Sequence, residues 1–320
     1  GDKATVCDAN VVLGYLPSDV KLGGAMNINR EAATAAVQTL ADAMDIDLMA
    51  AAEGIIKIVN ESMLGALRLV SVEQGYDPRD FALVGFGGAG PLHANALGVL
   101  SGSWPVIVPP GPGVLCAYGD ATTQIQDEAS RTYVTSVEAI SAEDLVSELE
   151  GLCARASQSF ITDGIGEEQH EVSYQADFRY AGQAFQLSLP VTIERLRSEG
   201  LSVLTDEFDR QHEQLFTFAL GMDHEIVMIR AVVKAESSLS ADLSQVSEGA
   251  TDLKAAAIHD TKVYVDQKWH DAVVYDRSKL GIDAVVIGPA IVVEMDSTTL
   301  ILADHAATVD KVGNLLINPV

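Results

Sequence analysis

A chain of 320 residues, of which 48% are hydrophobic and 21% charged, is long enough to bury two or three globular cores. Its formal net charge of −26 argues against nucleic acid and anionic membranes as partners, since both need a basic surface. The sequence has no run of about 18 apolar residues, so it predicts no membrane span. Its first residues lack the basic segment and the apolar segment of a signal peptide, so none is predicted.

The cysteines, Cys7, Cys116 and Cys153, are odd in number and show no metal-ligand or C-x-x-C spacing. This pattern is typical of reduced thiols in a cytoplasmic protein, and it predicts no metal site. Cys116 lies among alanine, leucine and valine, so we expect it to be a small core residue. The chain begins with Gly1 and not with Met, which favours processing or a fragment of a longer protein.

Two short polar side chains, Asp8 and Asn10, precede the first apolar run of the chain. One interpretation is an Asx-type turn or a cap, which needs these residue types and no ligand. The other is the lining of a cleft near the phosphates of a nucleotide or near a substrate. Residues 22–26 predict a second turn before the first long helices.

Two helices are predicted next, over residues 30–44 and about 48–74. The second is the clearest amphipathic segment of the chain, because its apolar residues recur at alternating steps of three and one. Asn60 and Glu61 interrupt its polar face, and we expect both to be solvated. Gly75 ends this helix.

The most informative stretch begins with residues 81–86, which predict a buried strand. Gly87, Gly88 and Gly90 follow, and glycine tolerates positive φ and leaves no side chain in the way of a ligand. Pro91 suits the first position of the helix that continues to about residue 100. A strand, a bare turn and a helix N-terminus favour binding of the phosphate or sugar of a nucleotide. The alternative is an ordinary glycine-rich βα turn without a ligand.

Several histidines are candidates for chemistry. His93 lies one turn into the helix behind the glycines, where contact with a nucleotide, substrate or metal and a structural hydrogen bond are both open. We expect His212 to lie on the solvated face of a helix, and His170, His224 and His305 to be exposed in turns. The local sequence shows no Ser-His-Asp or Cys-His arrangement.

After a strand at 105–108, the proline- and glycine-rich residues 109–113 interrupt regular structure, and a helix resumes over 114–125. The character of the chain changes near Asp127. Ser141 and Asp144 have the spacing of a helix-start box. The next predicted elements are strands at 172–178 and 183–189 forming a hairpin, a helix over 202–217, and a strand over 225–235.

Residues 237–252 are rich in Ser and Asp and predict a linker. Short β segments with intervening turns follow and predict a small antiparallel β module; they are residues 261–265, 272–275, 290–294 and 298–302. We therefore divide the chain into an α/β domain at 1–127, an α+β domain at 128–240 and a small β domain at 241–320.

Several strings together resemble the hydantoinase A/5-oxoprolinase family, whose relatives include the nucleotide-handling subunits of acetone and acetophenone carboxylases. The most specific string is Gly-Gly-Ala-Gly-Pro-Leu-His-Ala at 87–94, placed after the Asp-Pro-Arg-Asp turn at 77–80. The resemblance covers nearly the whole chain. Other strings that carry it are residues 5–14, 22–24, 52–63, 108–113, 179–183, 275–278, 288–291, 296–299 and 313–316.

The resemblance implies an α/β fold: the second lobe of an actin-like ATPase of the acetate and sugar kinase and actin type. In that fold two lobes close on ATP, and a glycine pair of the second lobe backs the adenosine. Gly87 and Gly88 would fill this role, with Ala89 and Gly90 completing the turn. His93, Asp8 and Asn10 complete the set of candidate nucleotide-binding residues.

The family's phosphate-gripping Asp-x-Gly-Gly-Thr-like turns lie upstream of the matched region, and no such string occurs here. The chain therefore resembles the C-terminal half of a hydantoinase A subunit. Contacts to Mg²⁺ and to the phosphates of ATP are expected from an N-terminal half, a separate or cleaved chain, and a hydantoinase B-like subunit is the expected further partner.

The resemblance implies an ATP-dependent amidohydrolase that opens a small cyclic amide, an imide or lactam such as hydantoin or 5-oxoproline, by phosphorylating the amide oxygen. One alternative is the nucleotide-binding subunit of an ATP-dependent ketone carboxylase. The other is a non-catalytic scaffold half that binds partners but no nucleotide.

Overall fold

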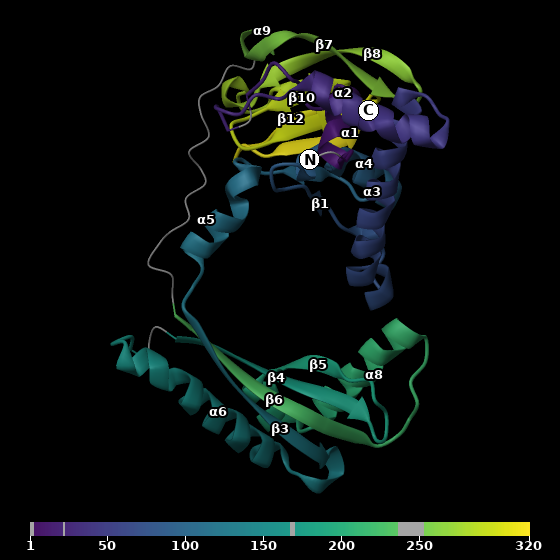
Figure 1. The fold of residues 1–320 in the computed structure, drawn as a ribbon. Helices are drawn as coiled ribbons and strands as arrows, with labels where there is room; N and C mark the ends of the chain where they lie inside the picture. Colours follow the sequence, from purple (N-terminus) through teal and green to yellow (C-terminus); the bar gives the residue numbers. More distant parts are fainter. Residues whose placement is uncertain (1–2, 22, 167–169, 236–252) are drawn as a thin grey trace. The chain divides into compact units, whose positions relative to one another are not determined.

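The computed structural model describes residues 3–21, 23–166, 170–235 and 253–320. The chain forms two compact units (Figure 1). The first unit consists of Gly1–Ala121 together with Ala241–Val320, and the second consists of Thr122–Ser240. The linker predicted at 237–252 and Leu22 of the predicted turn at 22–26 lie outside the described residues.

The first unit begins with three helices, α1 (Val6–Val12), α2 (Arg30–Met44) and α3 (Leu48–Val70). Polar side chains fix their starts: the Asn29 side chain accepts from an N–H of α2, and that of Asp47 from two N–H groups of α3. The prediction for α2 is confirmed. The helix α3 ends at Val70, four residues earlier than predicted, and a short 3₁₀ turn leads to Gly75 at φ 78°.

Two further helices follow the glycine-rich stretch, α4 (Gly90–Ser101) and α5 (Leu115–Thr122), and the four-residue α9 (Leu253–Ala256) precedes the C-terminal strands. Short 3₁₀ helices lie in the connections. Those of the first unit are η1 (Val72–Gln74), η2 (Pro78–Asp80), η3 (Pro112–Val114) and η6 (Arg277–Lys279), and that of the second unit is η4 (Val137–Ala139).

One sheet of the first unit has the order β1-β2-β13-β12-β9. Its strands β1 and β2 pair in parallel, and the other neighbours are antiparallel. The second sheet has the order β11-β10-β8-β7, with β8 and β10 parallel. The strands are β1 (Leu83–Val84), β2 (Val106–Val108), β7 (Ala257–Val265), β8 (Lys268–Asp276), β9 (Val285–Ile287), β10 (Ala290–Val293), β11 (Thr298–Ile301), β12 (His305–Val309) and β13 (Leu315–Pro319).

The C-terminal residues do not stand apart in this arrangement. The strand β13 pairs with β2, so that Leu316 lies opposite Ile107. Residues 241–320, which the sequence sets apart as a small antiparallel β domain, therefore share a sheet with residues of the N-terminal segment, and one of their own pairs is parallel. A pairing between segments about two hundred residues apart leaves no local pattern from which to predict it.

The strand predicted at 81–86 is much shorter in the structure. Only Leu83 and Val84 form β1, and Phe81, Val84 and Phe86 are each about half exposed. The prediction of a buried six-residue strand was wrong because β1 lies at the edge of its sheet, where one side has no neighbouring strand among the described residues.

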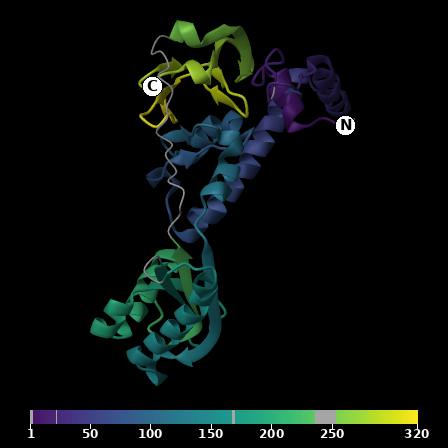
Figure 2. The same ribbon diagram turned by 90° about the vertical axis from the view of Figure 1, so that its left-hand side faces the viewer.

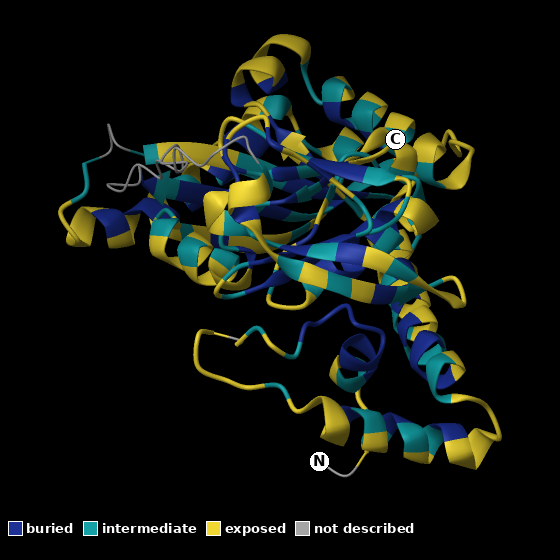
Figure 3. Ribbon diagram, turned by 90° about the horizontal axis from the view of Figure 1, so that it is seen from above, coloured by how far each residue is buried: buried dark blue, intermediate teal, exposed yellow. Residues whose placement is uncertain are grey.

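Two apolar cores stabilise the first unit, visible as the buried segments in Figure 3. In one, α1, α2 and α3 pack against strands of the second sheet, through residues such as Leu13, Val37 and Ile291. The other fills the space around β2, β10, β12 and β13. Shared burial of N- and C-terminal segments holds the two parts of this unit together.

The second unit is a helix-covered antiparallel sheet of order β3-β6-β4-β5 (Figure 2). The helix α6 packs against β3 and β6, and a capping box of Ser141 and Asp144 starts it, as predicted. The hairpin β4–β5, the helix α8 and the strand β6 are confirmed close to their predicted bounds. The elements are β3 (Gln126–Ser136), α6 (Ala142–Thr162), β4 (His170–Tyr180), β5 (Leu187–Val191), α7 (Ile193–Glu199), α8 (Ser202–Phe216) and β6 (His224–Ala235).

In the part of the chain that the structure describes, no helix combines the length and apolar character needed to cross a bilayer.

Candidate functional site

The glycine turn, Phe86–Gly90, connects β1 to α4. Gly87 has φ 86°, a left-handed conformation that glycine adopts without strain. No side chain caps the start of α4, whose N-cap is Ala89. A Cβ atom built on Gly87 or Gly90 would meet no atom within 4 Å, so the space beside these two residues is open. The turn thus offers bare backbone at a helix N-terminus, as the sequence predicts.

The other side of the glycine turn is held by two neighbouring loops. The Gly87 N–H donates to the Pro112 carbonyl oxygen at 2.7 Å. The Ser297 hydroxyl lies 3.2 Å from both the Gly87 and the Gly88 carbonyl oxygens and donates to them. The Val114 N–H donates to the Asp296 carboxylate at 3.1 Å, which ties the two supporting loops to each other. The position of the turn is therefore fixed from one side only.

A largely buried ion pair anchors these loops. Arg277 donates to the carbonyl oxygens of Val108 at 2.9 Å and Gly313 at 2.8 Å, and to the Glu294 carboxylate at 3.2 Å. The second oxygen of Glu294 accepts the Gly111 N–H at 3.3 Å. One guanidinium and one carboxylate thereby connect β2, the loop after it and the turn before β13.

Burial dominates the electrostatics of this pair. It raises the pKa of the Glu294 carboxyl to about 7, although Arg277 attracts the charged form. It also lowers the pKa of Arg277, against the attraction of Glu294. An arginine stays charged at neutral pH even so, whereas Glu294 lies near its point of titration.

Close backbone approach explains the glycine at 113. A Cβ atom at Gly113 would lie 2.3 Å from the Asp296 carbonyl oxygen, closer than real Cβ atoms come to such a neighbour. Gly111, with φ 57°, begins the same turn in a left-handed conformation. The proline- and glycine-rich residues 109–113 are thus the segment against which the 294–297 loop packs.

Four of these supporting residues were not predicted as site residues: Arg277, Glu294, Asp296 and Ser297. Arg277, Asp296 and Ser297 lie in strings, 275–278 and 296–299, that resemble the family, and Glu294 lies at the end of a predicted strand. The resemblance of these two strings was the signal that could have found Arg277, Asp296 and Ser297, and no such signal pointed to Glu294. The sequence could not show that they meet the glycine turn, because their partners are up to about two hundred residues away.

His93 makes a structural hydrogen bond. It is 5% exposed, and its Nδ1 lies 2.8 Å from the Asn60 Oδ1, which joins α4 to α3. Burial lowers the pKa of His93, which favours the neutral ring. Asn60, expected to be solvated, is 7% exposed, so that expectation was wrong: α4 covers this part of α3. A contact between His93 and a nucleotide stays a prediction.

Asp8 and Asn10 lie in the helix α1, not in the predicted turn. The Asp8 carboxylate accepts from the Thr5 N–H at 2.9 Å and from its hydroxyl at 2.6 Å, so the interpretation of Asp8 as a cap is confirmed. Asn10 is 2% exposed, and its Oδ1 has no hydrogen-bond partner in the described structure. The hydrogen bonds found among the described residues do not join either side chain to the glycine turn, and their cleft role stays a prediction.

Two histidines of the second unit are not exposed: His212 is buried and His224 is half-buried. His212 is 2% exposed, and its Nδ1 lies 2.8 Å from the Phe218 carbonyl oxygen. The His224 Nε2 lies 2.8 Å from the Asp209 carboxylate, which also accepts the Tyr180 hydroxyl at 2.6 Å. Both expectations were wrong because aromatic rings of α8, β4 and the following loop enclose these imidazoles.

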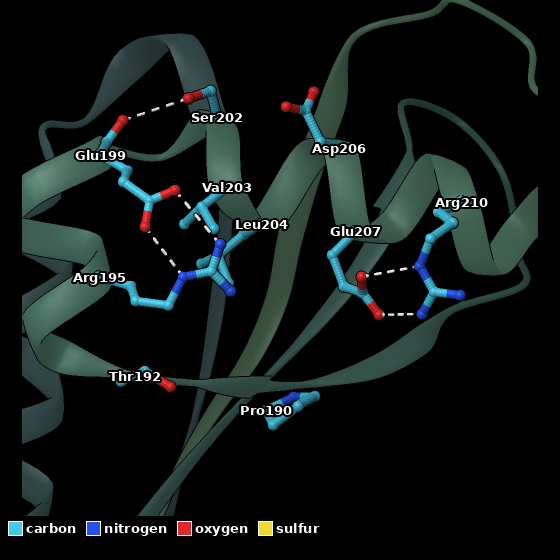
Figure 4. Close-up of a pocket in the computed structure, with 10 residues that line it drawn as sticks. All are labelled: Pro190, Thr192, Arg195, Glu199, Ser202, Val203, Leu204, Asp206, Glu207 and Arg210. Atoms are coloured by element: carbon cyan, nitrogen blue, oxygen red, sulfur yellow. Dashed lines mark hydrogen bonds and ion pairs between the residues drawn. The ribbon is translucent and has the colours of Figure 1, made fainter.

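A surface cavity of about 470 Å³ lies in the second unit, between the end of β5 and the helices α7 and α8 (Figure 4). Its two arginines are paired with glutamates of their own helices, Arg195 with Glu199 at 2.9 Å and Arg210 with Glu207 at 2.5 Å. Because each guanidinium is already matched by a carboxylate, these charges create no evident demand for an ionic ligand.

Among the described residues, no three His, Cys, Asp or Glu side chains gather closely enough to hold a metal ion. The three cysteines are free thiols. Cys116 is exposed on α5, so its assignment to the core was wrong. The exposed position follows from α5 itself, which buries none of its residues.

We expect Gly113→Ala to destabilise the first unit by about 1–3 kcal/mol, because the new methyl group must displace the Asp296 backbone. Urea unfolding measures the change. The matched control is Gly65→Ala in α3, where a Cβ meets no atom within 4 Å. There the higher helix propensity of alanine should raise the free energy of unfolding by up to about 1 kcal/mol. Equal effects of the two substitutions would contradict the close approach.

Glu294→Gln tests the raised pKa. The folded state holds the Glu294 proton up to about pH 7, and the ordinary value is 4.5. Between these values the folded state binds more protons, so this carboxyl makes the free energy of unfolding fall as pH rises, by up to about 3 kcal/mol. Unfolding free energies measured from pH 4 to 8 should lose this slope in Glu294→Gln and keep it in the exposed control Glu73→Gln. An unchanged slope would show that Glu294 titrates normally.

The chain is similar to proteins of known structure and activity. The ATP-dependent caprolactamase of Pseudomonas jessenii is similar in structure, with a TM-score of 0.86, 30% identity, and coverage of 100% of this chain and 47% of that one. Its subunit alpha is 32% identical over 330 residues. The nucleotide-free structure of acetone carboxylase has a TM-score of 0.71 at 23% identity, covering 99% and 46% of the two chains, which shows a common fold.

The chain spans a little under half the length of the first two curated relatives, 45% and 47%, and 26% of a 5-oxoprolinase of Arabidopsis thaliana. Two family descriptions match it in succession: Hydantoinase/oxoprolinase over residues 1–129, and the Hydantoinase/oxoprolinase C-terminal domain over residues 134–316. Together they cover nearly the whole sequence. The chain belongs to the hydantoinase/oxoprolinase family.

Proposed function

We propose that this chain supplies the adenosine side of an ATP site in an ATP-dependent enzyme that opens a cyclic imide or lactam, such as a hydantoin or 5-oxoproline. The observation that carries the proposal is the glycine turn, which is braced on one side by Ser297 and Pro112 and bare on the other. The similarity to a caprolactamase that is named as ATP-dependent supports both the cofactor and the substrate class.

The residues of the turn fit a nucleotide. Gly87, Gly88, Ala89 and Gly90 would hold its adenosine part against bare backbone, and the uncapped N–H groups of α4 would face its polar atoms. ATP would supply a phosphoryl group that converts the amide oxygen into a leaving group. The role of this chain is to position the nucleotide, a role in which rigid support matters. The ties from Ser297, Asp296 and Arg277 provide that support.

The proposed site is divided between polypeptides. Contacts to Mg²⁺ and to the phosphates are assigned to an N-terminal half that carries an Asp-x-Gly-Gly-Thr-like turn, a string that does not occur in the 320 residues. A hydantoinase B-like subunit would complete the ring-opening step, and the cytoplasm is the proposed location. The actin-like ATPase lobe is part of the same proposal.

A ketone carboxylase is the second candidate, because the fold is shared with acetone carboxylase. The two reactions differ in the co-substrates on which ATP hydrolysis depends. Bicarbonate-dependent ATP turnover with acetone or acetophenone favours the carboxylase, whereas turnover with a lactam or imide alone favours the hydrolase.

Gly90→Val tests the nucleotide role of the turn. A Cβ at Gly90 meets no atom within 4 Å, so the fold has room for the side chain, which then occupies the open space beside the turn. We expect nucleotide affinity of the assembled complex to fall about tenfold or more, or at least ~1.4 kcal/mol. Gly65→Val on α3 is the control. Unchanged affinity would favour the non-catalytic scaffold.

Partner dependence is tested by ATP hydrolysis. We expect the isolated chain to hydrolyse no Mg-ATP and the complex purified from the native source to do so with a cyclic amide. Mass spectrometry of that complex should find an N-terminal-half polypeptide and a hydantoinase B-like chain. Robust hydrolysis by the isolated chain would refute the divided site.

A further inference from the structure

A second cavity, of about 440 Å³, lies wholly within the first unit and away from the glycine turn. It is bounded by α3, the side of α4, the β7–β8 turn and the segment that follows β11. Its volume lies within the range of small-molecule sites. Apolar side chains form much of its wall, among them Ile56, Leu92, Leu300 and Leu302.

The charges of this cavity are unbalanced. Four carboxylates line it, those of Glu53, Glu61, Asp266 and Asp304, against the single ammonium group of Lys57. None of these five groups forms an ion pair among the described residues. This distinguishes the cavity from that of the second unit, where each arginine is matched by a glutamate.

Glu53 is the informative member of the set. It is 9% exposed, and its Oε1 accepts the Gln267 N–H of the β7–β8 turn at 3.2 Å. A buried carboxylate without a cation is costly, and one backbone N–H offsets only part of that cost. Burial, and after it the negative charges of Glu53 and Asp266, raise the pKa of the neighbouring Tyr15 hydroxyl. Both carboxylates therefore lie near Tyr15, at the same end of the cavity.

We propose that this cavity binds an aliphatic ammonium ion, with the charged nitrogen at Glu53 and the hydrocarbon chain along Ile56, Leu92 and Leu300. A cation satisfies the buried carboxylate, and an aliphatic body matches the apolar wall. A bare metal ion would leave that wall unused. Hydrolytic opening of a lactam produces an ammonium group on an aliphatic chain that also carries the new carboxylate, a link that rests on the proposed function, whereas the binding site itself does not.

The test is titration of the full 320-residue chain with hexylamine at neutral pH, followed by calorimetry, with 1-hexanol as the uncharged probe of the same length. We expect hexylamine to bind at least about ten times more tightly than 1-hexanol, the range of a charged hydrogen bond. Equal affinities, or no binding of either probe, would overturn the proposal. Because no nucleotide is present, the result is independent of the glycine turn.

Two variants locate the site. Glu53→Gln keeps an acceptor for the Gln267 N–H and removes the charge, so hexylamine affinity should fall about tenfold or more while 1-hexanol is unaffected. Ala96→Phe fills the cavity without changing a charge and should weaken both probes. Glu73→Gln, exposed and outside the cavity, is the control. Wild-type affinity for hexylamine in either cavity variant would refute the site, and the second variant decides if the first fails to fold.

Discussion

The largely buried contact between Arg277 and Glu294 is the constraint on which the candidate nucleotide site depends. Its two side chains bind the end of β2, the glycine at 111 and the turn before β13, and so fix the loops that hold the glycine turn. An exposed pair would contribute little, but in this one the guanidinium donates to two backbone carbonyl oxygens and the carboxylate accepts one backbone N–H. The open face of the turn can therefore be free of side chains and still be well positioned.

This constraint also explains why N- and C-terminal segments form one unit. Arg277, Glu294 and Ser297 come from the last eighty residues, and the turn that they support comes from the first hundred and thirty. The pairing of β13 with β2 brings the two segments together in the same sheet. If the two segments were treated as separate domains, the glycine turn would be separated from the residues that hold it, Arg277, Glu294 and Ser297. The second unit, inserted between them in sequence, has a core of its own and contributes no residue to these contacts.

Local patterns predicted the local structure well. The helix over 30–44, the helix start at Ser141 and the hairpin of β4 and β5 follow from caps, periodicity and alternation within each segment, and all three are confirmed. The glycine turn was also recognisable, because positive φ and a helix start depend on neighbouring residues. The errors have a common cause. The edge position of β1, the burial of Asn60 and the partners of Glu294 are set by segments distant in sequence, which single-sequence patterns do not report.

The helix α4 belongs to both sites of the first unit. Its N-terminus forms the end of the glycine turn, and its side carries Leu92 and Ala96 into the wall of the second cavity. Between them, His93 is fixed to Asn60 of α3, and Asn60 itself lines that cavity. A buried hydrogen bond of this kind resists rotation of α4 relative to α3, because breaking it would leave polar groups unsatisfied. This contact restrains the orientation of α4. A ligand bound in the cavity could therefore change the position of the glycine turn only by moving α4 against this hydrogen bond.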